Sequence, residues 1–367
     1  MKHQSSYLDW YIHVPNVRYD FRSSGINYFQ YNLSLGNVDL SINYDHGNPD
    51  AAKHLAKRYG VATQNVFISS EGTSGQNSRI TRYVAERNLR KNEAVVEYPT
   101  YEPLLRQVQE HFKRVKRFER CEKDSYRLDS DALRRVVSEK TGLLVLTNPH
   151  APSGAVSDAK ELREVMTVAR ELGFYVLCDE IYAEFDRKTV PTLFSVDPEW
   201  GIVTTSFTKA YGLGGLKLGI ALAQKEFVDE LYADVLNTVG NSPNIVQLIA
   251  AEMLAKGRQN LERHKLKWSR LKKDAERLLV EKNLEFFPNR VGITFWVKLP
   301  VKDTYRWVNE CAMPFYDLVV VPGTFFLFRN GSQLKRSSMV RFGLGGINPE
   351  KPNLAEGFQA LEKALNA

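Results

Sequence analysis

Short runs of consecutive apolar residues alternate with amphipathic stretches through the first two thirds of the chain, and this alternation limits the possible folds. The strand-like runs lie at residues 66–68, 94–96, 142–147, 174–178 and 202–205. Helical patterns lie between them, near residues 76–90 and 158–172. Strands that are apolar throughout are typical of a mostly parallel sheet with helices on both faces. The sequence therefore predicts an α/β fold in which ligands bind beyond the carboxyl ends of the strands.

The last third of the chain has a different pattern. A long helical region runs from about Asn244 to Lys282 and is interrupted near Gly257. Strand-like residues follow at 291–297 and 319–321. Because 367 residues are enough for two domains, we expect a second, smaller α+β domain here.

Composition excludes several classes of protein. Hydrophobic residues make up 43% of the chain and charged residues 25%, as in ordinary globular proteins. No run of about twenty apolar residues is present, so we expect no membrane span, and the N-terminus leads into no signal-peptide-like stretch. The three cysteines are far apart and the seven histidines lack metal-ligand spacing. We therefore expect a cytoplasmic protein without a disulfide framework or a metal site.

The formal net charge is +7, with a pI of about 9.1. A basic surface suits either nucleic acid or small anionic substrates. The basic residues are spread along the chain with acidic residues near them, and no nucleic-acid-recognition motif is present. We interpret the charge as a source of solubility and of attraction for small anions, and expect no nucleic-acid partner.

Lys209 lies in the stretch with the most specific chemistry, which begins just after the apolar run 202–205. Hydroxyl side chains stand three residues and one residue before it, at Ser206 and Thr208, and a cation follows at Lys217. This arrangement suits a phosphate beside a reactive amine, as pyridoxal phosphate requires. Taken alone, the stretch is better explained by a solvated surface lysine, since short motifs often match by chance.

Three other strand ends carry groups that suit parts of the same cofactor. Gly72, Thr73 and Ser74 precede a helix and predict an anion site at its N-terminus, although Ser74 as a simple helix cap explains them equally well. The loop at Asn148 contains two prolines and a glycine and predicts a rigid turn facing a ligand. Asp179 ends the next strand, where a carboxylate favours a protonated pyridine nitrogen. Four such strand ends together favour a cofactor site over four unrelated features.

Together these residues resemble the fold-type I pyridoxal-phosphate aminotransferases of class I and II, from about Leu35 to Arg341. The resemblance implies that Lys209 forms the internal aldimine with the cofactor and later moves a proton. It also implies a large cofactor-binding domain at residues 36–258 and a small domain built from residues 1–35 and 259–367.

The same resemblance assigns roles to the neighbouring residues. Asp179 would pair with the pyridinium nitrogen, Tyr182 would hydrogen-bond the ring oxygen, and Tyr101 would stack on the ring. The phosphate would be held by Thr73, Ser74, Ser206 and Lys217, and Gly72, Asn148 and Thr208 complete the expected cofactor-binding set.

Three further residues concern the substrate and a partner subunit. Arg341 matches the arginine that holds the substrate α-carboxylate, a task that suits the guanidinium fork. Gly36 matches the N-terminal segment that lines the substrate pocket. Tyr44 resembles a tyrosine that reaches the partner subunit's phosphate, which implies a homodimer with shared active sites.

The chain departs from the family pattern at two positions. Lys217 stands where the family usually has arginine, so the charge is kept and the fork geometry is lost. Ala151 stands where the family usually has asparagine, which removes a donor to the ring oxygen and predicts a raised internal-aldimine pKa.

The resemblance implies amino transfer between an L-amino acid, with aspartate or glutamate favoured, and a 2-oxo acid. Arg18 and Arg22 are candidates to meet an acidic substrate side chain, and a pair of surface arginines is an equally good interpretation. A β-lyase, a histidinol-phosphate-type or aromatic aminotransferase and a non-catalytic ligand-sensing module remain alternatives.

Overall fold

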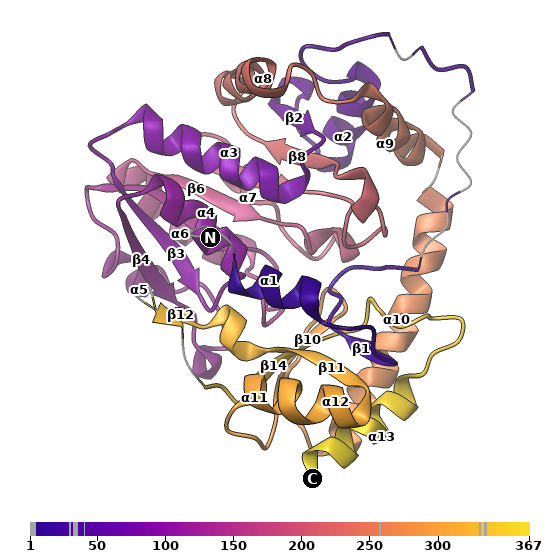
Figure 1. The fold of residues 1–367 in the computed structure, drawn as a ribbon. Helices are drawn as coiled ribbons and strands as arrows, with labels where there is room; N and C mark the ends of the chain where they lie inside the picture. Colours follow the sequence, from indigo (N-terminus) through magenta and orange to yellow (C-terminus); the bar gives the residue numbers. More distant parts are fainter. Residues whose placement is uncertain are drawn as a thin grey trace.

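The computed structural model describes residues 5–28, 31, 36–39, 41–256, 258–329, 332–333 and 336–367. The molecule contains two main sheets in separate parts, and each sheet packs against its own helices (Figure 1). The first sheet is formed between residues 66 and 222, and most of the second is formed by the C-terminal part of the chain.

The larger sheet has seven strands in the order β2-β8-β7-β6-β5-β3-β4. All neighbours are parallel except β8, which runs antiparallel to both β2 and β7. In chain order the strands are β2 (Val66–Ser69), β3 (Glu93–Tyr98), β4 (Arg114–Glu119), β5 (Thr141–Thr147), β6 (Tyr175–Asp179), β7 (Gly201–Thr205) and β8 (Gly219–Leu222). The predicted α/β fold with a mostly parallel sheet is confirmed, and β4 and β8 are additions to it.

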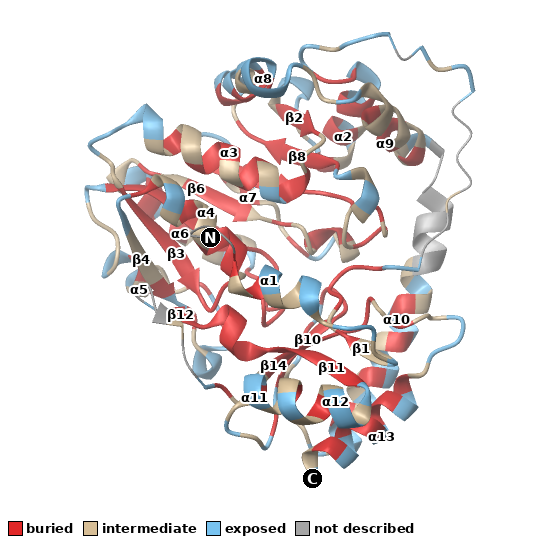
Figure 2. Cartoon of the chain, in the orientation of Figure 1, coloured by how far each residue is buried: buried red, intermediate tan, exposed pale blue. Residues whose placement is uncertain are grey.

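Helices cover both faces of this sheet because its strands are apolar on both sides (Figure 2). Alternate strand residues join two separate hydrophobic clusters, one on each face. One face carries α2 (Pro49–Tyr59), α5 (Ser130–Arg134), α6 (Ala159–Leu172), α7 (Leu193–Val196) and α9 (Asn244–Lys256). The other carries α3 (Gly72–Arg87), α4 (Glu102–His111) and α8 (Lys225–Val239).

The helices of the larger sheet begin in two different ways. Asn48 caps α2, and Asp158 forms a capping box with Glu161 at the start of α6. By contrast, α3 begins at Gly72, and its N-cap residue Glu71 makes no side-chain capping bond. The interpretation of Ser74 as a simple N-cap is therefore wrong, since the helix starts before it.

The smaller sheet has five strands in the order β1-β11-β14-β10-β9, which confirms the second, smaller sheet. Its strands are β1 (Tyr19–Phe21), β9 (Glu285–Phe287), β10 (Thr294–Lys298), β11 (Leu318–Pro322) and β14 (Met339–Gly343), and β12 (Phe328–Arg329) pairs with β13 (Ser332–Gln333) beside it. Helices α10 (Arg258–Glu281), α11 (Thr304–Trp307), α12 (Met313–Tyr316) and α13 (Leu354–Leu365) accompany it, with a π-helical turn at Val308–Ala312. The domain limits at residues 35 and 258 stay predictions.

The first helix, α1 (Ser6–His13), joins the two parts of the molecule (Figure 1). The Glu102 carboxylate at the start of α4 accepts hydrogen bonds from the backbone of Ser6 and Tyr7 and from the Ser5 hydroxyl. On the other side, the Trp10 indole donates to Asn309 of the smaller part. Among the described helices, none has both the length and the apolar character needed to cross a bilayer.

Candidate active site

Asp179 ends β6, and its carboxylate is held by two donors. Asn77 Nδ2 donates to Oδ2 at 2.9 Å, and the Ile181 backbone N–H donates to Oδ1 at 3.0 Å. Asn77 is itself oriented by Thr204, whose hydroxyl donates to Asn77 Oδ1 at 2.6 Å. Burial nevertheless raises the pKa of Asp179 from 3.8 to about 6. This carboxylate is therefore fixed in position and is in an environment that favours a cationic partner.

Lys209 follows β7, and its side chain packs against the N-terminal segment at Gly25. Gly25 lies so close that an added Cβ would be 2.9 Å from Lys209 Cδ, and the Ile26 backbone N–H donates to the Lys209 carbonyl at 2.9 Å. Burial lowers the pKa of the Lys209 amine, and the charges of Arg341 and Asp179 also act on it. A lowered pKa suits an amine that must lose its proton in order to react.

The polar atoms between the end of β2 and the first turns of α3 show whether this region suits the phosphate of pyridoxal phosphate. Side-chain atoms of Ser69, Ser70, Thr73 and Gln76 are buried there without a hydrogen-bond partner among the described residues. Buried polar groups normally have partners, and the uncapped N-terminus of α3 adds free N–H groups and a favourable dipole. The residues present fit an anionic group such as the phosphate of pyridoxal phosphate.

The loop after Lys209 closes this region from the other side. Gly72, with φ +66°, donates its N–H to the Lys217 carbonyl at 2.5 Å, which fixes the start of α3 against the loop. The buried Ser206 hydroxyl accepts from the Thr208 N–H at 3.1 Å. Of the expected phosphate ligands, Thr73 and Ser206 are buried, whereas Ser74 and Lys217 are exposed.

Arg341 lies on β14 and is 3% exposed. Its Nη2 donates to the Tyr7 hydroxyl at 3.0 Å and to the Arg22 carbonyl at 2.9 Å, and its Nε is buried without a partner among the described residues. The Phe326 ring lies 5.2 Å from its guanidinium carbon. Nearby phenols raise the pKa of Arg341 despite its burial, so it stays charged.

Two tyrosines, Tyr101 and Tyr182, interact with these charged groups. Burial raises the pKa of the Tyr101 phenol well above 10, and it interacts electrostatically with Tyr182, Arg341 and Asp179. Its ring meets that of Tyr7 edge-on at 5.4 Å. Tyr182 and Arg341 line the same small pocket. Lys209, Asp179, Tyr101, Tyr182 and Arg341 thus act on one another although they come from four separate segments of the chain.

Asn148, Gly36 and Tyr44 are three further residues with expected roles in the site. The Asn148 amide donates to the Ser157 carbonyl and its oxygen accepts from the Ser157 N–H, so the side chain shapes its own loop. Gly36 is exposed with open space around it, and Leu35 lies outside the described residues. Tyr44 accepts a backbone bond from Gly47 in the loop before α2. The cofactor and substrate roles of these residues stay predictions.

Ala151 stands where the family usually has asparagine, and the loop around it shows what surrounds this position. The Ala151 N–H donates to the Thr147 hydroxyl at 2.8 Å, and Ala151 lines the small pocket beside Tyr182 and Arg341. His150 does not point a free nitrogen there, since its ring nitrogens lie 2.7 Å from the Ser153 hydroxyl and 3.0 Å from the Pro99 carbonyl. His150 therefore offers no replacement for the missing amide donor.

The sequence interpretation missed three residues of this site: Tyr7, Gly25 and Asn77. Asn77 stands four residues after Thr73 and so lies on the same face of α3, a spacing that points to it in retrospect. Gly25 lies in a short Ser-Ser-Gly segment, which signals a close backbone approach only weakly. Nothing in the sequence around Tyr7 indicates that it reaches Arg341.

A partly buried lysine with a lowered pKa, a carboxylate at a strand end, an anion-binding helix start and a buried arginine together define a site for amino-group chemistry on a phosphorylated pyridine cofactor. Residues 34–351 match the family described as aminotransferase class I and II. The chain belongs to this family, whose members are pyridoxal-phosphate-dependent enzymes.

Individual relatives are similar over different shares of the chain. An aspartate aminotransferase of Pyrococcus horikoshii is 25% identical over 332 residues, which cover 85% of this chain and 79% of that protein. A histidinol-phosphate aminotransferase of Archaeoglobus fulgidus is 30% identical over 174 residues, or 46% of this chain and 52% of that protein. The solved structure of an aromatic aminotransferase from Pyrococcus horikoshii has a TM-score of 0.78 at 19% identity, with 98% and 99% of the two chains covered, and supports the fold alone.

Proposed function

We propose that this enzyme transfers the amino group of an L-amino acid to a 2-oxo acid, with Lys209 as the catalytic amine. The observation that supports this most is that Lys209, partly buried against Gly25 beyond the end of β7, has its pKa lowered by burial, with the charges of Arg341 and Asp179 also acting on it. When bound, pyridoxal phosphate supplies an aldehyde that accepts the amino group and a ring that stabilises negative charge at the substrate Cα.

The residues of the site then have separate roles in amino transfer. Asp179, fixed by Asn77, keeps a proton on the ring nitrogen through its negative charge. Thr73 and Ser206 hold the phosphate at the start of α3, and Arg341 orients the substrate through its carboxylate. Lys209, with its lowered pKa, moves the proton between the substrate Cα and the cofactor carbon.

Aspartate or glutamate is the donor that we propose first, supported by the relatives named aspartate aminotransferases. The contacts of the two candidate arginines give this choice no support. Arg18 pairs with Glu356 at 2.7 Å on the surface, and Arg22 pairs with Asp20 at 2.8 Å.

An aromatic donor is the second candidate, and a specific observation favours it. The rings of Tyr7 and Phe326 lie 5.7 and 5.2 Å from the Arg341 guanidinium carbon, and Tyr101 packs against Tyr7. An apolar side chain next to a bound α-carboxylate would meet ring surfaces there.

An absorbance experiment tests the reaction and the donor together. The purified protein is loaded with pyridoxal phosphate and mixed separately with L-aspartate, L-glutamate, L-phenylalanine and histidinol phosphate. We expect the visible band of the bound cofactor to disappear as the 2-oxo product forms, fastest with the true donor. A band that persists while ammonia is released from a donor with a Cβ leaving group would instead identify a β-lyase.

The proposal includes a homodimer with shared sites, for which Tyr44 is the supporting residue. Tyr44 belongs to the loop before α2, where its carbonyl accepts from the Gly47 N–H. Sedimentation at several protein concentrations tests the dimer. Mixing Tyr44→Phe with an inactive Lys209→Ala chain tests sharing, since one site of each mixed dimer would regain both side chains.

A further inference from the structure

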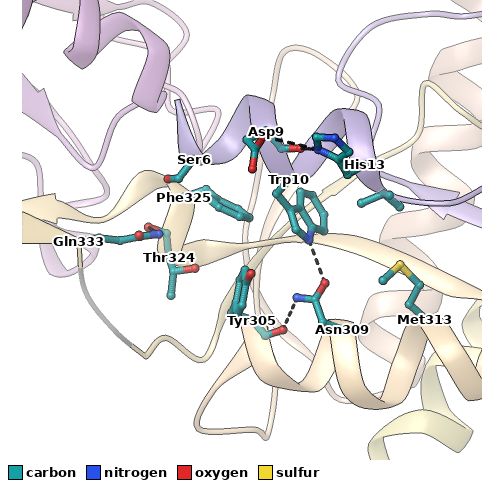
Figure 3. Close-up of a pocket in the computed structure, with 11 residues that line it drawn as sticks. Ser6, Asp9, Trp10, His13, Tyr305, Asn309, Met313, Thr324, Phe325 and Gln333 are labelled. Atoms are coloured by element: carbon teal, nitrogen blue, oxygen red, sulfur yellow. Dashed lines mark hydrogen bonds and ion pairs between the residues drawn. The ribbon is translucent and has the colours of Figure 1, made fainter. Parts of the chain in front are cut away.

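Two helices near the start of the chain are each tied to the rest of the molecule by polar side chains. At α1, the Trp10 indole donates to Asn309 at 3.0 Å. Figure 3 shows this bond beside a cavity of about 600 Å³, and Lys209 is not among the described residues that line it. At α2, by contrast, Arg58 contacts residues on both sides of Lys209 along the chain.

Lys209 stands in the middle of a backbone turn. The Tyr211 N–H donates to the Phe207 carbonyl at 3.2 Å, so the chain folds back between the second residue before Lys209 and the second residue after it. The rings of Phe207 and Tyr211 meet edge-on at 5.1 Å between centroids, and both side chains are buried. The position of the Lys209 backbone therefore depends on what holds these two rings.

Arg58 contacts both rings of this turn. Its guanidinium carbon lies 5.8 Å from the centre of the Phe207 ring and 5.7 Å from the centre of the Tyr211 ring. Both distances are in the range of cation–π contacts. Its Nη2 also donates to the Tyr211 hydroxyl at 2.5 Å. Arg58 thus holds the turn through two ring faces and one hydroxyl group.

Glu184 fixes Arg58 and Tyr211 relative to each other. Its buried Oε2 accepts from Arg58 Nη2 at 2.5 Å and from the Tyr211 hydroxyl at 3.2 Å, and its Oε1 accepts from the Tyr59 hydroxyl at 2.8 Å. Burial raises the pKa of Glu184, but the charges of Arg58 and Arg187 outweigh this effect and hold the pKa below its usual value. The carboxylate is therefore ionised at neutral pH, and its hydrogen bonds are strong ones.

Glu184 also connects the turn to the other side of the site. It lies in the short 3₁₀ helix Ala183–Phe185, which directly follows Tyr182. Asp179 ends the strand just before, so Asp179, Tyr182 and Glu184 come from one continuous segment. The hydrogen bonds of Glu184 consequently fix the turn that carries Lys209 relative to the segment that carries Asp179.

We propose that Arg58 is a positioning residue for Lys209, because it fixes the turn Phe207–Tyr211 from which the Lys209 amine extends. The inference rests on the function proposed above, in which this amine attaches the cofactor and moves a proton. A lysine side chain is a flexible four-carbon stem, and a displacement of about 1 Å at a reacting group costs about a hundredfold in rate. With the turn fixed, only the side-chain torsions of Lys209 remain to be set.

Two conservative variants weaken these contacts without leaving the buried carboxylate unpaired. Arg58→Lys keeps the positive charge beside Glu184 and loses the fork that also reaches Tyr211. Tyr211→Phe keeps the ring and loses the hydroxyl. Arg187→Lys is the matched control, because Arg187 pairs with the buried Glu180 at 2.5 Å. Among the described residues, Arg187 makes no hydrogen bond or cation–π contact with either ring of the turn.

Binding of the cofactor tests the position of the amine without turnover. The cofactor-free protein is mixed with pyridoxal phosphate, and the rise of the visible band is followed by stopped-flow absorbance. We expect the band to form about tenfold more slowly in Arg58→Lys and in Tyr211→Phe, and at the wild-type rate in Arg187→Lys. Equal rates in all four proteins would overturn the role of Arg58. A wild-type protein that forms no band would overturn the proposed function itself, and this inference with it.

An isotope effect separates positioning from a purely structural role. With a donor deuterated at Cα, the rate of amino transfer in Arg58→Lys should fall about tenfold at unchanged KM. The primary isotope effect should be at least as large as in the wild type, because proton transfer by Lys209 limits the rate. The double variant with Tyr211→Phe should be no slower than the slower single variant, since both changes remove one bond. If Arg58→Lys shifts only the urea unfolding midpoint, or is slower with a smaller isotope effect, the proposal is wrong.

Discussion

The candidate active site has a phosphate end, at the start of α3, and a carboxylate end, at Arg341. The two ends differ in whether their polar groups already have hydrogen-bond partners. At the phosphate end, buried atoms of Ser69, Thr73 and Gln76 have no partners among the described residues, and the N-terminus of α3 has no side-chain cap. At the carboxylate end, Arg341 Nη2 already donates to the Tyr7 hydroxyl and the Arg22 carbonyl. The phosphate end is thus formed in advance, whereas a substrate carboxylate must compete with contacts inside the protein.

The difference follows from where each end comes from in the sequence. The phosphate end is built from two short loops of one sheet, joined by the Gly72 N–H to the Lys217 carbonyl. The carboxylate end joins Tyr7 to Arg341, which are 334 residues apart, through the packing of α1 between the two parts of the molecule. A contact that joins two parts of the molecule changes when these parts move relative to each other, whereas a contact within one sheet does not.

The largest expected effect lies between the two ends, at Lys209. Lys209→Ala removes the amine that attaches the cofactor and moves the proton, so we expect the rate of amino transfer to fall by at least about a thousandfold. Stopped-flow absorbance with the donor in excess measures this. Lys217→Ala is the matched control, because it removes a lysine of the same loop and should weaken cofactor binding with the proton-transfer step intact. Equal loss of that step in both variants would contradict the role of Lys209.

The next largest effect is expected at the carboxylate end. Arg341→Lys keeps the positive charge and loses the fork, so KM for the amino donor and for the 2-oxo acid should rise about tenfold to a hundredfold. The cofactor affinity, measured by absorbance titration, should stay the same. If Arg341→Lys weakened the binding of cofactor and substrate alike, the phosphate end and the carboxylate end would not act independently.

Asp179 gives a smaller effect with a defined pH dependence. Burial raises its pKa from 3.8 to about 6, so the folded protein binds the proton more tightly than the unfolded chain. The ionised carboxylate therefore costs stability above pH 6, and this cost disappears as the pH falls below about 4.

Asp179→Asn should consequently stabilise the cofactor-free protein by about 1–3 kcal/mol at pH 7.5 and by almost nothing at pH 4. Urea unfolding at the two pH values measures the difference. With the cofactor bound the sign should reverse, because the variant loses the charge that holds the ring nitrogen. A stabilisation that does not depend on pH would mean that the charge of the Asp179 carboxylate is not the cause.

The site residues that follow strands could be predicted from the sequence, since the carboxyl ends of parallel strands meet at one edge of the sheet. Lys209 and Asp179 are of this kind, and Arg341 was found through the resemblance alone. Tyr7 and Gly25 could not be predicted, because the packing of α1 and its following segment against distant elements decides their positions. Asn148 shows a different limit of sequence analysis. Its position after a strand is predicted correctly, but the local sequence does not reveal that its amide already forms two hydrogen bonds with the backbone of Ser157.

The smallest predicted effect tests the competition at the carboxylate end directly. The Tyr7 hydroxyl accepts from the same Arg341 nitrogen that a substrate carboxylate would use, so binding must break or share that bond. Tyr7→Phe removes the competing acceptor and keeps the ring that packs on Tyr101. The dissociation constant of a 2-methyl amino acid, which lacks the Cα proton and cannot react, should therefore fall by about twofold to tenfold, as expected for one hydrogen bond. Tyr11→Phe in the same helix is the control and should leave this constant unchanged. If the constant rises in Tyr7→Phe, the Tyr7 hydroxyl is part of the substrate site, and the carboxylate end is formed in advance like the phosphate end.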